Sequence, residues 1–527
     1  MSGGNKSLVP FTARIIVGKF DVNTRLQFPR VLQLLLDCVL TLDVGSSSAR
    51  TLVFGFDGKA IPGFGHQVAY RGRVTPDGGW EIDPEALADI CEDAVDRACG
   101  QFRAAGIRPA AVAFDTFWQH ILGVGEKGTP VTPILHVFDT RGASQAKKLA
   151  AHIDNRAQHQ RTGAPFHPSF APAKLLWLAE TRPAAFAAAK RWMTFGEYFF
   201  QRIFGRAVTS TCMASGTGLW DQKKNAYDEE LLAFLPVTRG QFANPDEMDV
   251  SQSALLPAFA EQWPELNGIP WFPALGDGAC DNVGSGCVTA DRFALMVGTS
   301  GAMRAIVLEE PPFLPDGLFC YRLDRKRFVL GGAFSNGGEV FAWCKRTLRL
   351  PSDEELEAQL AAMPAGEHGL TLVPLLAGER SPNWRPEARA AITGLGSAST
   401  PAEIVRGALE SVAVNFREVY EMMAKCAGRP KEIIASGGAL LRSPAWVQMM
   451  ADALNRPVIE CLEAEATSRG AALMTLERIG AIADFPAGDL PAKLGTVVSP
   501  IETNHAAYLR LLSRQRALYT KLFEESW

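Results

Sequence analysis

The sequence predicts an α/β protein made of two related domains. Three observations lead to this prediction. The 527 residues exceed what one hydrophobic core usually supports. Segments with strand and helix patterns alternate along the chain, as in layered α/β folds. The pattern of residues 42–47, Leu-Asp-Val-Gly-Ser-Ser, is echoed at residues 295–300 by Leu-Met-Val-Gly-Thr-Ser. Such internal similarity indicates a duplicated unit.

In the first half, two β-rich apolar runs at residues 39–44 and 51–56 flank a loop of small residues. This pattern predicts a strand, a tight turn and an antiparallel strand. A helix is expected to open at Asp83-Pro84, because apolar residues then recur at three- and four-residue steps. Two further strands are expected at residues 110–115 and 120–124.

The second half repeats the theme of strand, turn and helix. After the 295–300 echo, an apolar run completes a second hairpin. A strand, a Gly-Gly turn and a helix follow, an order that is typical of ligand-facing sheet edges. The expected strands are at 304–308, 432–435 and 457–460, and the expected helices are at 403–423, 444–454, 466–478 and 504–523.

Composition excludes several classes of protein. Hydrophobic residues at 47%, charged residues at 21% and a net charge of -4 describe a packed globular chain. The 53 Lys and Arg residues are interspersed with 57 Asp and Glu residues, so no basic face for nucleic acid is expected. No apolar run reaches the ~18 residues of a membrane span. We therefore expect neither nucleic acid nor membrane as a partner.

The cysteines and the N-terminal segment indicate the cellular compartment of the protein. The ten cysteines are scattered and no pair is spaced as CxxC, which favours buried free thiols over disulfides or metal ligands. Residues 1–30 contain no apolar signal-peptide core. The sequence thus predicts a cytoplasmic protein. It assigns no role to residues 1–38 and leaves the oligomeric state open, with a homodimer as one option.

The turn at Gly45, Ser46 and Ser47 suits phosphate binding. Backbone N–H groups and hydroxyls in such a turn can converge on phosphate oxygens. Asp43, at the end of the preceding strand, can face a magnesium ion through waters. An ordinary hairpin turn is the alternative for one copy, but two copies favour nucleotide binding. Neither the Walker pattern nor the dinucleotide fingerprint is present.

Asp277 opens a helix that is rich in small residues, at residues 276–286. It could simply cap the helix. Alternatively, it could act as a general base that takes a proton from a substrate hydroxyl. Asp281 lies four residues later, so both carboxylates could face one cleft. From spacing alone, capping is the preferred interpretation.

Taken together, these motifs resemble the FGGY family of carbohydrate kinases. The first phosphate motif of that family is similar to residues 42–50 and the second to residues 297–301. The catalytic aspartate motif is similar to Gly276-Asp277 with Gly284, and the adenosine motif to residues 436–443. Two family signature stretches fit residues 174–178 and 376–382. The resemblance runs from about Thr41 to the C-terminal helix. It implies two duplicated actin-like ATPase (ribonuclease H-like) domains with a cleft between them.

The resemblance implies transfer of the γ-phosphoryl group of ATP, with Mg²⁺, to a sugar hydroxyl. It makes Asp277 the general base, which reverses the preference for capping, and places Asp43 on the magnesium side. It implies phosphate contacts from Gly45, Ser46, Ser47, Gly298 and Thr299 and adenosine contacts from Gly437, Gly438 and Ala439. The predicted domains are residues 39–288 on the sugar side and 289–527 on the nucleotide side, after an extension at 1–38.

Within the family, the chain most resembles gluconate kinases, at residues 161–168, 195–205 and 377–384. The usual Met-His pair of the sugar loop is replaced by Trp118 and Gln119. Trp118 is predicted to stack on a sugar face, Gln119 to bond hydroxyls, and Asp139 and Arg141 to hold further oxygens. Arg141 favours a carboxylate because guanidinium matches it bidentately, although arginine also binds neutral hydroxyls. The alternatives are that Trp118 is core and that Asp139 and Arg141 form a surface pair. A ketopentose kinase, for xylulose or ribulose, is the rival within the class. A non-catalytic, nucleotide-gated actin-like binding protein is the rival from another class.

Overall fold

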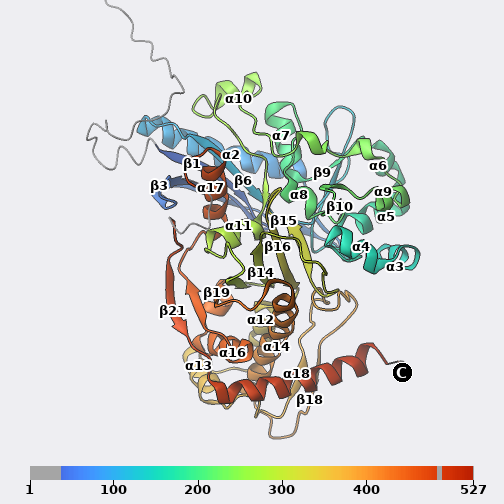
Figure 1. Ribbon diagram of the computed structural model, residues 1–527, viewed down its shortest axis with the longest axis vertical. Helices are drawn as coiled ribbons and strands as arrows, with labels where there is room; N and C mark the ends of the chain where they lie inside the picture. The colour runs from blue at the N-terminus through green and yellow to red at the C-terminus, as the bar shows by residue number, and fades with distance from the viewer. Residues whose placement is uncertain (1–36, 484–489, 526–527) are drawn as a thin grey trace, which may run out of the picture.

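The computed structural model describes residues 37–483 and 490–525, so nearly all of the predicted N-terminal extension lies outside the described residues. The chain forms two α/β halves, one above the other in Figure 1, each built around its own sheet. The N-terminal half is the upper one in this view.

The N-terminal sheet has five strands in the order β12-β6-β1-β2-β3. Strand β1 (Cys38–Val44) pairs antiparallel with β2 (Ser48–Gly55) and parallel with β6 (Ala111–Thr116). The remaining strands are β3 (Ala60–Ala69) and β12 (Leu275–Gly276). Every residue of β1 is buried. This explains its continuous apolar run, since a strand covered on both faces needs no polar side.

The C-terminal sheet repeats this arrangement. Strand β13 (Arg292–Val297) pairs antiparallel with β14 (Gly301–Val307) and parallel with β19 (Glu432–Ser436), as β1 does with β2 and β6. The predicted duplication is therefore confirmed at the level of strand pairing. The other strands of this seven-stranded sheet are β15 (Phe319–Arg322), β16 (Phe328–Phe334), β20 (Val458–Cys461) and β21 (Leu494–Val498).

The predicted helices are also confirmed. Asp83 caps α2 (Pro84–Ala105) by accepting hydrogen bonds from the backbone of the first turn, and Thr400 forms a capping box at the start of α14 (Pro401–Ala427). The other helices expected in the second half are α16 (Pro444–Leu454), α17 (Ala466–Arg478) and α18 (Glu502–Phe523).

The remaining elements complete the two halves. In the N-terminal half they are β4 (Arg73–Val74), β5 (Trp80–Ile82), β7 (Leu122–Val124), β8 (Ile134–Leu135), α3 (Ala143–His152), α4 (Asn155–Thr162), α5 (Ala171–Thr181), α6 (Pro183–Ala188), β9 (Arg191–Met193), α7 (Phe195–Phe204), α8 (Thr211–Ser215), β10 (Trp220–Asp221), β11 (Ala226–Tyr227), α9 (Glu229–Phe234), η1 (Arg239–Gln241), η2 (Pro245–Glu247), α10 (Pro257–Gln262) and α11 (Asp277–Gly284). In the C-terminal half they are α12 (Gly338–Thr347), α13 (Asp353–Ala362), β17 (Thr371–Val373), β18 (Ala391–Thr393) and α15 (Gly438–Leu441).

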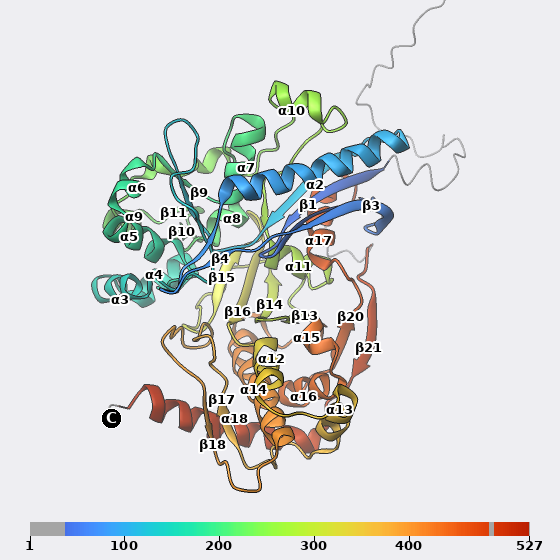
Figure 2. The ribbon, with the colours of Figure 1, turned by 180° about the vertical axis from the view of Figure 1, so that it is seen from behind.

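Helix α17 joins the two halves. It follows the C-terminal sheet in sequence, yet it packs against α11, β1 and β6 and lies in the upper half in both ribbon views (Figures 1 and 2). The crossing of α17 and α11 depends on two glycines. A Cβ at Gly284 would lie 1.7 Å from the Ala466 oxygen, and one at Gly470 would lie 1.8 Å from the Cys280 oxygen. The Gly284 of the catalytic aspartate motif is thus explained by close helix contact.

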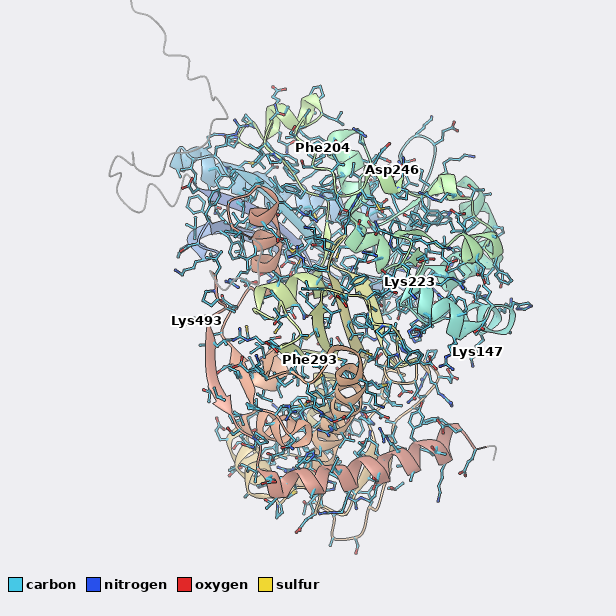
Figure 3. All side chains as sticks on the ribbon, viewed as in Figure 1. Lys147, Phe204, Lys223, Asp246, Phe293 and Lys493 are labelled. Atoms are coloured by element: carbon cyan, nitrogen blue, oxygen red, sulfur yellow. The ribbon has the colours of Figure 1, made fainter. Side chains whose placement is uncertain are left out.

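Each half has its own hydrophobic core (Figure 3), with Phe204 in the core of the upper half and Phe293 in that of the lower half. All ten cysteines lie in the described part, where none forms a disulfide, and all but Cys426 are buried. Among the described residues, we find no helix that combines the length and the apolar character needed to cross a membrane.

Candidate active site

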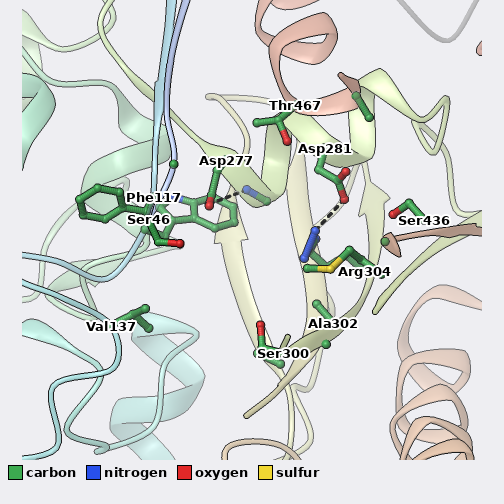
Figure 4. A pocket seen from close by; sticks show the side chains of 18 of the residues that line it. Ser46, Phe117, Val137, Asp277, Asp281, Ser300, Ala302, Arg304, Ser436 and Thr467 are labelled. Carbon is green, nitrogen blue, oxygen red and sulfur yellow. Dashed lines mark hydrogen bonds and ion pairs between the residues drawn. The ribbon is translucent and has the colours of Figure 1, made fainter. Parts of the chain in front are cut away.

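A cavity of about 670 Å³ is lined by residues of both halves. The β1–β2 turn contributes Gly45 to Ser48, and the equivalent β13–β14 turn contributes Ser300 and Gly301. Figure 4 shows Ser46 and Ser300 on two sides of this space, with Asp277 and Asp281 projecting into it from α11. The duplicated turns therefore face one common site.

Asp277 is the first residue of α11, and Gly276, not Asp277, occupies the N-cap position. The capping interpretation is therefore wrong. The Asp277 Oδ1 accepts a hydrogen bond of 2.7 Å from the Gly278 N–H, and the side chain lines the cavity. Burial raises its pKa to about 6; Arg304 and the Gly278 N–H oppose this shift, while Asp43 and Asp281 add to it. The carboxylate is therefore ionised at neutral pH, and its pKa lies close to the value at which a general base works best.

Arg304 places a positive charge in the same cavity. It is 6% exposed, and its Nη2 donates to Asp281 Oδ2 at 2.8 Å (Figure 4). Its Nε donates to Asn282 Oδ1 at 3.0 Å. This pairing fixes the guanidinium near Asp277. Sequence reasoning missed Arg304, although a charged residue inside the apolar run of β14 was an available signal.

Asp43 lies at the end of β1 and is 3% exposed. Its Oδ2 accepts a hydrogen bond of 2.7 Å from Ser468 Oγ of α17 and lies 3.7 Å from Arg50 Nε. Arg50 in turn pairs with Glu465 at 2.5 Å. Burial raises the pKa of Asp43, and Arg50 and Ser468 oppose that shift. Residues of α17 thus help to hold the carboxylate that was predicted to lie on the magnesium side.

Asp115 is a third carboxylate that sequence reasoning did not assign to the site. It pairs with Asp43 in the register of β6 and β1, is 0% exposed, and neither of its oxygens has a hydrogen-bond partner. Burial and the charges of Asp43 and Asp277 raise its pKa well above the usual value. No signal short of strand register could have placed it beside Asp43.

These oxygens fit a magnesium ion that is also bound by water and phosphate. Hard oxygen donors are what Mg²⁺ prefers, and it usually keeps several waters. The described residues contain no group of three or more His, Cys, Asp or Glu side chains that could hold a metal by themselves. A magnesium ion here would therefore depend on nucleotide and water oxygens for most of its ligands, with Asp43 as the predicted carboxylate on its side.

The predicted phosphate contacts divide into two groups. Gly45, Ser46 and Ser47 line the cavity, and Ser46 and Ser47 are exposed to it. Gly298 and Thr299 do not line it; their carbonyls accept hydrogen bonds from Gly338 and Glu339 at the start of α12, at 2.8 and 3.0 Å. In the second turn, the neighbouring residues Ser300 and Gly301 face the space instead.

The predicted adenosine contacts lie at the end of β19. Gly437 and Gly438 line the cavity, whereas Ala439 packs against Gly338 and does not. Gly437 has a φ of +93°, and a Cβ there would lie 2.4 Å from the Val297 oxygen, so no other residue fits. Leu441 and residues 461–467 complete this wall of the cavity.

Of the four predicted sugar contacts, Trp118 and Gln119 line the cavity. Trp118 is 5% exposed; its Nε1 donates to the Cys212 oxygen at 3.2 Å, and its ring meets Tyr321 edge-on at 5.3 Å. A Cβ at Gly276 would lie 2.0 Å from this ring. Trp118 is therefore both a core residue and part of the cavity wall beside Asp277.

Asp139 and Arg141 do not line this cavity. Arg141 donates to Asp139 Oδ2 at 2.6 Å and to Glu81 at 2.7 Å, and its guanidinium stacks over Trp177 at 4.2 Å. Both members of the pair are buried, so the surface-pair interpretation is wrong. Their direct contact with a substrate stays a prediction, and the paired geometry does not favour it.

Comparison with known proteins decides the family. Residues 38–284 match the N-terminal domain model of the FGGY family of carbohydrate kinases, and residues 293–476 match its C-terminal domain model. The chain belongs to the FGGY family. It is thus an ATP-using carbohydrate kinase, which excludes the non-catalytic binding protein.

Several relatives are similar over nearly the whole FGGY chain. A gluconokinase of Bacillus subtilis is 28% identical over 499 residues, covering 90% of this chain and 94% of that protein. A glycerol kinase of Thermus brockianus is 29% identical over 472 residues, covering 86% and 92%. Crystal structures of a gluconate kinase and of a ligand-bound xylulose kinase, both from Lactobacillus acidophilus, each superpose with a TM-score of 0.85 at 26% identity, covering 92% of this chain and 98% of the other.

Proposed function

We propose that this FGGY kinase transfers the γ-phosphoryl group of ATP to a hydroxyl of a sugar acid, with gluconate as the leading substrate. The observation that carries the proposal is the position of Asp277 in the cavity, between the two duplicated turns. The similarity to a gluconokinase and to a gluconate kinase structure supports the choice of substrate.

In the proposed reaction, Asp277 acts as the general base. The substrate hydroxyl loses its proton to the Asp277 carboxylate as its oxygen attacks the γ-phosphorus. The bond between that phosphorus and the bridging oxygen breaks, and ADP leaves with the electron pair. The pKa of about 6 suits this role, because the carboxylate is free to accept a proton at neutral pH.

The other groups of the cavity neutralise charge and position the reactants. Ser46, Ser47 and Gly437 line the nucleotide side, and Arg304 offers a fixed guanidinium that can meet the negative charge on the phosphoryl group. Mg²⁺ bound with the nucleotide would neutralise further phosphate charge, on the side of Asp43 and Asp115. Positioning of this kind supplies most of the rate in phosphoryl transfer.

A ketopentose kinase remains the second candidate, because the xylulose kinase structure superposes equally well. We also propose a cytoplasmic location, because buried cysteines that form no disulfide are typical of a reducing compartment.

A coupled ADP-release assay across aldonates, ketopentoses and polyols tests the substrate. We expect turnover of gluconate; turnover of xylulose or ribulose without gluconate would reject the sugar-acid proposal. The Asp277→Asn variant tests the base, since it keeps the shape and removes the proton acceptor. We expect turnover to fall at least ~100-fold with ATP binding retained, the lower end of what a general base contributes.

A further inference from the structure

Arg380 is an arginine of the cavity wall that has no carboxylate partner. It lines the same cavity as Asp277, and its Nη2 donates to the Phe334 carbonyl at 2.7 Å. Its Nε is buried and has no hydrogen-bond partner. No carboxylate in the described ranges lies within ion-pair distance of it, in contrast to Arg304 and Arg141.

The surroundings of Arg380 are rich in donors and poor in negative charge. His136 lines the same cavity; its Nδ1 accepts a hydrogen bond of 3.4 Å from Phe138 N–H, so its proton sits on Nε2, which has no partner. Burial and the charges of Lys174, His120 and Arg380 keep the pKa of His136 well below its usual value. The ring is therefore neutral and presents a second unpaired donor.

An uncompensated guanidinium in a partly buried position is costly unless a ligand supplies the missing anion. Burial lowers the pKa of Arg380 to about 10, the phenolic side chain of Tyr321 opposes this shift, and Arg304 adds to it. No acidic side chain offsets the burial. The position is thus prepared for a negative group that the described protein does not provide.

The aromatic pair Trp118 and Tyr321 connects the surroundings of Asp277 with those of Arg380 in the wall of the same cavity. Trp118 packs against Gly276 and Gly278 next to Asp277, and its ring meets Tyr321, which is the electrostatic neighbour of Arg380. A polyhydroxylated chain lying along this wall would have one end at the general base and the other at the guanidinium.

We propose that Arg380 binds the carboxylate of the acceptor substrate and thereby selects an aldonic acid over a neutral sugar. The guanidinium can form two parallel hydrogen bonds with a carboxylate, and His136 Nε2 can add a third donor. This inference rests on the proposed function and moves the carboxylate contact from Arg141, which is already neutralised, to Arg380.

The test compares gluconate with its neutral analogue gluconamide as acceptors in the ADP-release assay. We expect the wild type to prefer gluconate in kcat/KM by roughly 10- to 100-fold, the range for a charge-assisted hydrogen bond. In Arg380→Gln this ratio should fall to about 1, because the acid loses its partner while the amide keeps a hydrogen bond. The KM for ATP should not change. Arg380→Lys should restore part of the preference.

Arg389→Gln is the matched control, because it removes an exposed arginine from the same loop. It should keep the wild-type ratio. Both kcat/KM values of a ratio are measured on the same protein. A misfolded fraction of Arg380→Gln lowers both values equally and so cancels from the ratio. If the ratio is unchanged in Arg380→Gln and gluconate is still a good substrate of the wild type, this inference is overturned and the proposed function stands. A wild type that uses ketopentoses and no aldonate would overturn the proposed function and, with it, the carboxylate contact.

Discussion

Asp43 and Asp115 occupy paired positions on the adjacent parallel strands β1 and β6, so two buried carboxylates lie side by side, and the first of them lines the active-site cavity. Ser468 and Arg50 partly satisfy Asp43, whereas Asp115 has no hydrogen-bond partner. Two such groups do not both ionise readily in a dry site. Without a cation, the pair therefore holds a proton at pH values where an exposed aspartate has lost it.

This relationship predicts that Asp115→Asn stabilises the metal-free protein at neutral pH. The pKa of Asp115 is raised in the folded state, so its contribution to stability is full below the unfolded pKa of ~3.9 and is lost as the pH rises toward the folded value. Asn carries no such penalty and can donate to Asp43. We expect the Tm of the variant to exceed that of the wild type by about 2 °C or more at pH 8 in EDTA, and by less at pH 5.

Differential scanning fluorimetry at the two pH values measures this difference. Asp246→Asn, at an exposed position of the upper half (Figure 3), is the control and should leave the Tm unchanged at both pH values. A wild type that is more stable than Asp115→Asn at pH 8 would contradict the prediction.

The pH dependence of turnover should report Asp277. Its pKa of about 6 means that the carboxylate is ionised above that value and protonated below it. A protonated base cannot accept the substrate proton, so kcat/KM should fall about tenfold per pH unit below pH 6 and level off above it. Initial rates from pH 5 to 8 at saturating MgATP measure this limb. A profile that stays flat down to pH 5 would remove Asp277 from the role of base.

Local pattern was sufficient for the strands and the turns, because neighbouring residues determine hairpins and helix starts. For Asp277 the local pattern favoured capping, and only the family resemblance assigned it as the base. Local pattern failed where partners come from distant segments. Asp115 sits in an apolar run, and only the register of β6 against β1 brings it beside Asp43. Arg141 and Arg380 look alike in sequence, but a bond to Glu81 neutralises the first and none reaches the second. The contact of α17 with the N-terminal sheet has the same long-range origin.

Lys174 is predicted to hold the sugar loop in place. It is 1% exposed, and its Nζ donates to the carbonyls of Gln119 and Ser169 at 2.5 and 2.6 Å. Gln119 has a φ of +54°, a conformation that a non-glycine residue adopts only when its surroundings impose it. Lys174→Met keeps the length and removes the donors. We expect the sugar KM to rise by about tenfold, as for the loss of one such hydrogen bond, with little change in the KM for ATP.

Steady-state kinetics with each substrate varied in turn separates these two constants. Lys147→Met, at an exposed lysine of α3 (Figure 3), should leave both unchanged. An equal rise in the two KM values, or none, would mean that Lys174 does not act through the sugar loop.

The crossing of α11 and α17 gives a prediction about stability that is independent of chemistry. A Cβ at Gly470 would lie 1.8 Å from the Cys280 oxygen, which belongs to rigid helix backbone, so Gly470→Ala must push the two helices apart. We expect a loss of about 1–3 kcal/mol in the free energy of unfolding, as for other overpacked cores.

Gly100→Ala is the matched control, because that exposed position of α2 has nothing within 4 Å of a Cβ. There, alanine should stabilise by about 0.5–1 kcal/mol through its helix preference. Urea unfolding of the two variants measures both changes. Because α17 also carries Ser468, the Gly470→Ala variant should lose kcat as well, whereas an unfolding curve like that of the wild type would show that the helices do not meet at this glycine.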